Sequence, residues 1–269
     1  MSEFTQRVIA GVLGSLTIFS SLYYSEWTYF ALFFVICMLS CLEFYKLLGL
    51  DGNLPLKTYG TLNSLFIYSL TFLIARGDLQ SEYYLLIFLT ASAIYLIKLY
   101  IKRDKRPFTN IAFTFLGIIY VGIPFALLNL ATFFDNRYHY EVVFGCLLIL
   151  WSSDSGAYCA GKNFGRRKLF ERVSPKKTWE GSVGGAVLAL AVAYGLSTLF
   201  DIIPLWKWLC IAMIIVVGGT YGDLIESLFK RSLLIKDSGK SIPGHGGFLD
   251  RFDGLLIASP FIVAFLRLL

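Results

Sequence analysis

The chain has 269 residues, of which 57% are hydrophobic and only 16% are charged, and its mean hydropathy is +0.67. Ordinary soluble domains carry about 25% charged residues, so this composition excludes a soluble globular fold. The net charge of +6 would suggest nucleic-acid binding in a soluble protein, but in a membrane protein it more often reflects basic cytoplasmic loops. We therefore expect an integral membrane protein that has no nucleic-acid partner.

Apolar segments follow one another along the whole chain, and their length approaches the roughly 20 residues needed to cross the hydrocarbon core. They comprise residues 8–24, 27–48, 58–75, 83–101, 111–131, 142–161, 181–200, 207–229 and 247–269. The sequence therefore predicts an all-α, polytopic transmembrane protein with about nine spans.

Basic residues alternate between the loops and predict the orientation of these spans. Each loop after an even-numbered segment, counted with its flanking residues, holds two to seven Lys or Arg residues, whereas each loop after an odd-numbered segment holds at most one. Because basic loops remain in the cytoplasm, the alternation predicts an N-in, C-out topology.

The character of the segments changes midway along the chain. The first five carry few ionisable groups, whereas the last four contain Gly, Asp and Lys near their cytoplasmic ends. We expect residues 1–140 to form N-terminal spans for support, dimer and lipid contact, and residues 141–269 to form a C-terminal catalytic transmembrane region.

Carboxylates gather near the cytoplasmic ends of the last four segments, at Asp154, Asp223, Glu226, Asp250 and Asp253. A charged side chain inside a span costs about 2.5–3.5 kcal/mol on insertion scales and marks a functional site by default. Several carboxylates at one depth repel each other unless a cation joins them, and such oxygen ligands suit Mg²⁺. Singly, each is explained as well by an interhelical contact or a helix cap. Their clustering favours a site.

Basic residues emerge at the same membrane face and suit a phosphate-rich substrate. In the stretch SPKKTWEG, Lys176 and Lys177 precede a helix that either Ser174 or Thr178 is placed to cap. A helix N-terminus beside two lysines is a favourable phosphate site. Carboxylates, basic residues and glycine turns together indicate metal-assisted phosphoryl chemistry.

A motif in the last quarter of the chain resembles the signature of the phosphatidate cytidylyltransferase family, also called CDP-diacylglycerol synthase. The matching residues are Ser227, Lys230, Arg231, Lys236, Asp237, His245, Gly246, Gly247, Asp250, Arg251 and Asp253, in the order and spacing of that signature. The stretches DSGAYCAGKNFG and SPKKTWEG resemble two further blocks of the family, and together these blocks cover about the last 120 residues.

The resemblance implies an enzyme of phospholipid biosynthesis, a nucleotidyltransferase. It would convert CTP and phosphatidate into CDP-diacylglycerol and pyrophosphate, with Mg²⁺ as cofactor. It also implies a multi-pass protein of the bilayer, in the plasma or inner membrane if bacterial, which forms a homodimer and has its active site facing the cytoplasm.

Roles for the charged residues follow from this implied reaction and from their charges. We expect Asp223 and Asp250 to be the principal Mg²⁺ ligands, with Asp253 and Asp154 as further ligands and with room for a second cation. The predicted catalytic residues are Asp223, Asp250, Asp253, Lys230 and Lys236. The predicted substrate-binding residues are Lys176, Lys177, Ser227, Arg231, Asp237, His245, Gly246, Gly247 and Arg251.

Other readings stay open at the level of the sequence. A CTP-dependent polyprenol or lipid kinase and an ether-lipid cytidylyltransferase would use similar groups, although the complete HGGxxDRxD block favours phosphatidate cytidylyl transfer. An ion transporter would place its acids near the bilayer midplane in paired, broken helices. An inactive member of the family would have lost some motif residues.

Overall fold

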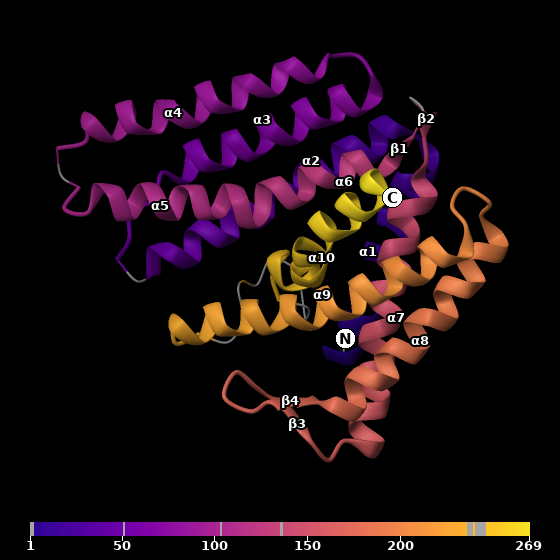
Figure 1. The fold of residues 1–269 in the computed structure, drawn as a ribbon. Coiled ribbons are helices and arrows are strands. Elements are labelled where there is room, and N and C mark those ends of the chain that lie inside the picture. Colours follow the sequence, from indigo (N-terminus) through magenta and orange to yellow (C-terminus); the bar gives the residue numbers. More distant parts are fainter. Residues whose placement is uncertain (1–2, 51, 103, 135–136, 236–238, 240–245) are drawn as a thin grey trace. The chain divides into compact units, whose positions relative to one another are not determined.

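The computed structural model describes residues 3–50, 52–102, 104–134, 137–235, 239 and 246–269 (Figure 1). Two compact units divide the chain. One comprises Met1–Tyr138 with Asp237–Arg251, and the other comprises His139–Lys236 with Phe252–Leu269. The functional division expected near residue 140 stays a prediction.

The first unit is built from helices that follow the predicted segments (Figure 1). They are α1 (Glu3–Tyr24), α2 (Glu26–Leu50), α3 (Lys57–Arg76), η1 (Ser81–Tyr84), α4 (Leu85–Leu99), α5 (Pro107–Gly117), η2 (Ile118–Gly122) and α6 (Ile123–Thr132). The π-helical turn η2 joins α5 to α6, so that these three elements form one continuous helical stretch. The antiparallel strands β1 (Phe133–Phe134) and β2 (Arg137–Tyr138) follow.

The second unit contains long helices and one short hairpin. Its elements are α7 (Tyr140–Phe164), β3 (Lys168–Phe170), β4 (Ser174–Thr178), α8 (Trp179–Leu199) and α9 (Leu205–Ser232), together with most of α10 (Leu249–Leu268). Each of the nine predicted apolar segments coincides with one helical stretch of the described chain.

This agreement confirms the all-α, polytopic membrane fold. Six helical stretches of the described residues are long and apolar enough to cross a membrane. The number of spans as nine and the N-in, C-out orientation remain predictions. The strands β3 and β4 form where the sequence predicts only a basic loop.

A tyrosine between two glycines fixes the helix packing of the first unit. The ring of Tyr45 on α2 occupies the space that side chains at Gly60 of α3 and Gly117 of α5 would fill. Its hydroxyl donates a hydrogen bond of 2.7 Å to the carbonyl of Thr114. Because glycine has no Cβ, three helices approach one buried ring at this point.

A polar network closes the connection between α4 and α5 in the same unit. Lys98 Nζ lies 2.5 Å from Asp104 Oδ2 and donates to the carbonyl of Leu54 at 2.9 Å. Asp104 Oδ1 also accepts hydrogen bonds from the Arg106 amide and the Asn110 side chain. The exposed fractions of the Lys98 and Asp104 side chains are only 3% and 2%, so this ion pair is buried.

Small residues bring the helices of the second unit into close contact. A Cβ at Gly156 of α7 would lie 2.8 Å from the carbonyl oxygen of Gly184 on α8, and a Cβ at Gly185 would lie 2.8 Å from the carbonyl oxygen of Ser153. Such close packing is what glycines in membrane spans commonly allow.

Glycines also bring α9 against α10. A Cβ at Gly218 would meet Ala258 at 2.9 Å, and a Cβ at Gly222 would lie 2.6 Å from the carbonyl oxygen of Asp253. The backbone that carries Asp253 therefore lies directly against α9, one residue before Asp223.

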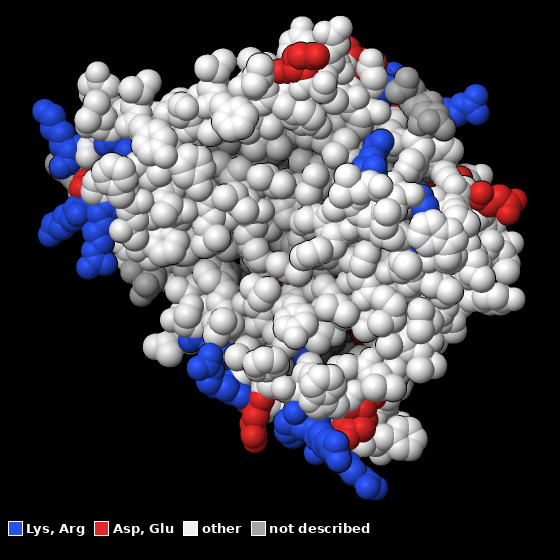
Figure 2. Space-filling view, in the orientation of Figure 1, with Lys and Arg blue, Asp and Glu red and all other residues white. Residues whose placement is uncertain are grey.

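Charged side chains gather at the ends of helices, while the helix flanks in the same view are almost free of charge (Figure 2). In the first unit they concentrate at the connection between α4 and α5, and in the second around the β3–β4 hairpin. This distribution is expected for helices whose flanks face lipid and whose ends reach water.

Candidate active site

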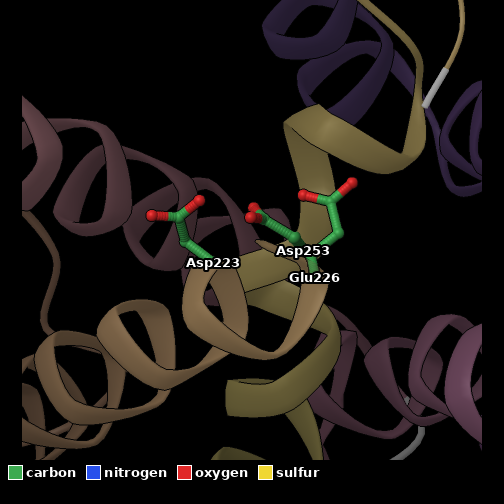
Figure 3. Close-up of side chains that lie close together, drawn as sticks. All are labelled: Asp223, Glu226 and Asp253. Carbon is green, nitrogen blue, oxygen red and sulfur yellow. The ribbon is translucent and has the colours of Figure 1, made fainter. Parts of the chain in front are cut away.

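Three carboxylates of the second unit come together at the contact of α9 with α10. One carboxylate oxygen each from Asp223, Glu226 and Asp253 lies within 4.8 Å of the other two. Figure 3 shows Asp223 and Glu226 on neighbouring turns of α9, with Asp253 reaching between them from α10. Asp223 and Glu226 are three residues apart on α9 and therefore share one helix face. The close contact between Gly222 and the backbone of Asp253 brings the third carboxylate next to them.

Two lysines partly neutralise this acidic cluster. Lys177 Nζ lies 2.6 Å from Asp223 Oδ2, and Lys230 Nζ lies 3.3 Å from Glu226 Oε2. Three acids and two lysines leave a formal charge of −1. Glu226 is only 1% exposed, and a buried carboxylate is costly unless it is paired or binds a cation.

The donor set fits a hard divalent cation. Three carboxylates converge from two helices, and oxygen ligands of this kind are those that Mg²⁺ and Ca²⁺ take in proteins. The acidic cluster therefore has the chemistry of a metal site, and its basic neighbours have the chemistry of a phosphate site.

The β3–β4 hairpin delivers Lys177 to the cluster. Its strands pair antiparallel, with Lys168 opposite Thr178 and Phe170 opposite Ser174. Lys177 Nζ also donates to the carbonyl of Thr220 at 3.1 Å, so this ammonium group contacts α9 at two points.

The hairpin is fixed to the start of α8 by capping interactions. The Thr178 hydroxyl accepts a hydrogen bond from the Gly181 amide at 3.2 Å, which identifies Thr178 as the cap among the two predicted candidates. Glu180 accepts from the amides of Arg166 and Arg167, which precede β3 at the same open end of the hairpin. A capping hydroxyl and a first-turn acid are both favourable at a helix N-terminus.

Two of the four predicted metal ligands, Asp223 and Asp253, lie in the acidic cluster. Asp154 is exposed on α7. In the first unit, Asp250 Oδ2 accepts a hydrogen bond from the Gly247 amide at 2.9 Å.

The other predicted site residues are distributed as follows. Lys230 contacts the cluster through Glu226, while Ser227 and Arg231 belong to the same helix end. Lys176 is exposed on β4, and Arg251 is exposed on α10. Gly246, at φ +83°, and the buried Gly247 form the turn before α10. The predicted residues Lys236, Asp237 and His245 lie outside the described residues.

Glu226 is the member of the cluster that the predicted ligand set omits. The sequence places it three residues after Asp223 and four before Lys230, which are spacings of side chains that meet on a helix. This spacing is the signal by which the sequence indicates Glu226 as a neighbour of Asp223 and Lys230. The near-complete burial of its carboxylate is known only from the structure.

Comparison with known proteins agrees with this chemistry. The chain matches the cytidylyltransferase family over residues 5–269. It is 33% identical over 284 aligned residues to the phosphatidate cytidylyltransferase of Bacillus subtilis (strain 168), covering 100% of this chain and 99% of that protein. The phosphatidate cytidylyltransferase of Staphylococcus saprophyticus is 34% identical over 229 residues, covering 84% of this chain and 85% of that protein.

A similarity of this extent spans both units, including the acidic cluster, the β3–β4 hairpin and the N-terminal helices. The protein is thus a multi-pass membrane protein that belongs to the cytidylyltransferase family.

Proposed function

We propose that the protein transfers the cytidylyl group of CTP to phosphatidate, forming CDP-diacylglycerol and releasing pyrophosphate. The observation that carries the proposal is the acidic cluster with its two lysines, in a chain related over its full length to phosphatidate cytidylyltransferases. The reaction belongs to phospholipid biosynthesis, and its lipid substrate and product remain in the bilayer.

The chemistry needs charge neutralisation more than a strong base. The attacking group is the phosphate monoester of phosphatidate, which is already anionic near neutral pH, and the target is the α-phosphorus of another anion. Catalysis therefore depends on positioning both anions and on reducing their repulsion. Lys177 and Lys230 are suited to this role because both ammonium groups lie at the acidic cluster.

The cofactor that best suits the cluster is Mg²⁺, with Asp223, Glu226 and Asp253 as the proposed ligands. When bound, the cation would neutralise phosphate charge and hold the triphosphate in place. Asp250 and Asp154 stay proposed as further ligands or supports, and a second cation remains part of the proposal.

The remaining motif residues are proposed to contact substrate. Lys176 is placed to reach the triphosphate or the lipid phosphate from the exposed edge of β4. We also propose a homodimer, an active site facing the cytoplasm, and a division of labour between a supporting N-terminal half and a catalytic C-terminal half.

The test uses purified protein with phosphatidate, Mg²⁺ and CTP labelled either at the α- or at the γ-phosphate. Cytidylyl transfer places the α label in the lipid fraction and the γ label in pyrophosphate. A lipid kinase would instead place the γ label in the lipid, and a transporter would place neither there.

Two controls sharpen this assay. An ether-linked phosphatidate analogue used in parallel distinguishes an ester-lipid from an ether-lipid enzyme. The Asp253→Asn variant should insert and purify normally but form no liponucleotide, because it removes a carboxylate from the cluster. Failure of the wild-type protein to form any α-labelled lipid would refute the proposed function.

A further inference from the structure

A carboxylate that is far from the motif residues in the sequence, Glu43 on α2, lies buried near the C-terminal end of that helix. Its exposed fraction is 8%, in a helix long and apolar enough to cross a membrane. An acid in such a position is costly to insert, so its retention calls for a specific partner.

One partner is the backbone at the start of α10. Glu43 Oε2 accepts a hydrogen bond of 3.0 Å from the Leu249 amide, across 206 positions of sequence. Both residues belong to the first unit. The first amides of a helix lack intrahelical acceptors, and a carboxylate there gains from both the hydrogen bond and the helix dipole.

The same carboxylate lies against a second part of this segment. A Cβ built on Gly239 would lie 3.0 Å from Glu43 Oε1 and 3.6 Å from the Cα of Gly247. The backbone at Gly239 and the backbone from Gly247 to Leu249 therefore meet at the Glu43 carboxylate.

Asp250 stabilises the same turn through a hydrogen bond within it. Its Oδ2 accepts from the Gly247 amide at 2.9 Å, and Gly246 before it adopts φ +83°, a conformation that favours glycine. The turn from Gly246 to Asp250 is thus held by two carboxylates, one of its own and one from α2. A shift of this turn would move the Asp250 side chain and the start of the helix that bears it.

We propose that Glu43 is a positioning residue for the reaction, which acts by anchoring the turn Gly246–Asp250 through the Leu249 amide. The inference rests on the proposed function, since it assigns the turn to the catalytic machinery. Glu43 accepts a hydrogen bond from the backbone of this turn, and its proposed effect on turnover passes through the placement of Asp250. Misplacement by about 1 Å, even from a distant change, is enough to reduce turnover substantially.

Two substitutions and one control separate positioning from simple destabilisation. Glu43→Ala removes the acceptor, whereas Glu43→Gln keeps an oxygen that can accept from the Leu249 amide. The control is Ser40→Ala, one turn earlier on α2. Ser40 is fully buried, and its hydroxyl has no hydrogen-bond partner within the described part of the chain.

Amide hydrogen exchange and steady-state kinetics of the full-length protein provide the readouts. In Glu43→Ala, exchange in a peptide covering residues 246–252 should rise, and kcat should fall by about tenfold or more because the turn is no longer held. The KM for CTP should change much less than kcat. Glu43→Gln should recover part of both effects, and Ser40→Ala should match the wild type.

The inference is overturned if Glu43→Ala keeps the wild-type kcat. It is equally overturned if kcat falls while exchange in residues 246–252 stays unchanged, because the loss would then not pass through the turn. If the wild-type protein makes no CDP-diacylglycerol, the proposed function fails, and the exchange measurement alone still decides whether Glu43 anchors the turn.

Discussion

Replacing Lys177 with methionine tests whether this lysine serves both the substrate and the acidic cluster. Lys177 Nζ lies 2.6 Å from Asp223 Oδ2, and the two side chains are 27% and 41% exposed. Ion pairs of such exposure contribute about 0.2–1 kcal/mol. Lys177→Met should therefore change the unfolding temperature little, while it removes a cation proposed to contact phosphate.

Cation binding and turnover should respond to this substitution in opposite directions. Without Lys177, Asp223 is released for a divalent cation, and a gain of up to about 1 kcal/mol corresponds to up to about fivefold tighter binding. Turnover should fall by about 10²–10³-fold, the range for losing one preorganised group that stabilises transition-state charge.

Mn²⁺ titration followed by electron paramagnetic resonance measures cation affinity without any turnover, and labelled CTP measures kcat. The matched control is Lys176→Met on the same strand, which should leave Mn²⁺ affinity unchanged because Lys176 forms no ion pair among the described residues. Unchanged turnover in Lys177→Met, or weaker Mn²⁺ binding, would refute the dual role of Lys177.

Three further substitutions probe the cluster and the fold. Glu226→Gln should weaken Mn²⁺ binding and reduce turnover, and wild-type Mn²⁺ affinity would remove Glu226 from the ligand set. Gly222→Ala places a Cβ 2.6 Å from the Asp253 carbonyl and should cost about 1–3 kcal/mol of stability together with activity, measured by thermal unfolding and label transfer. Asp104→Asn should destabilise the protein by about 1–3 kcal/mol, because Lys98 loses its charged partner. Burial alone would raise the pKa of the Asp104 carboxyl, but hydrogen bonds from Lys98 and neighbouring donors lower it overall. Its stabilisation is therefore complete above the ordinary pKa of about 3.9 and is lost as pH falls through the lower folded value. Unfolding temperatures measured across this range should show that loss in the wild type and not in Asp104→Asn, and identical pH profiles would contradict the assignment.

The helices were predictable because the signal for a membrane span is local. Each expected segment, such as 142–161, matches a helix whose ends differ by only a few residues, here Tyr140–Phe164. Hydrophobic length alone decides such elements. The β3–β4 hairpin was not predictable in this way, since its strands of three and five residues are too short for an alternation to be read.

The cluster was predictable in part. The gathering of carboxylates near the ends of the spans pointed to Asp223, Glu226 and Asp253, and the family-like motif also contains Asp253, but the predicted ligand set left Glu226 out. Which face of α9 meets α10 depends on the contacts of Gly218 and Gly222, and these are tertiary facts. Once that face is known, helix spacing brings Glu226 into the cluster as directly as Asp223.

The long-range contact of Glu43 could not be predicted from the sequence. Its neighbours, in the stretch CLEFYK, give no indication of a partner 206 positions away, although the cost of an acid in a span indicates that a partner must exist. Long-range backbone contacts of this kind depend on how the chain returns to α2 after α9. The local motif therefore contains groups proposed to do chemistry, whereas Glu43, the group proposed to hold the turn in place, lies on a helix that the motif does not include.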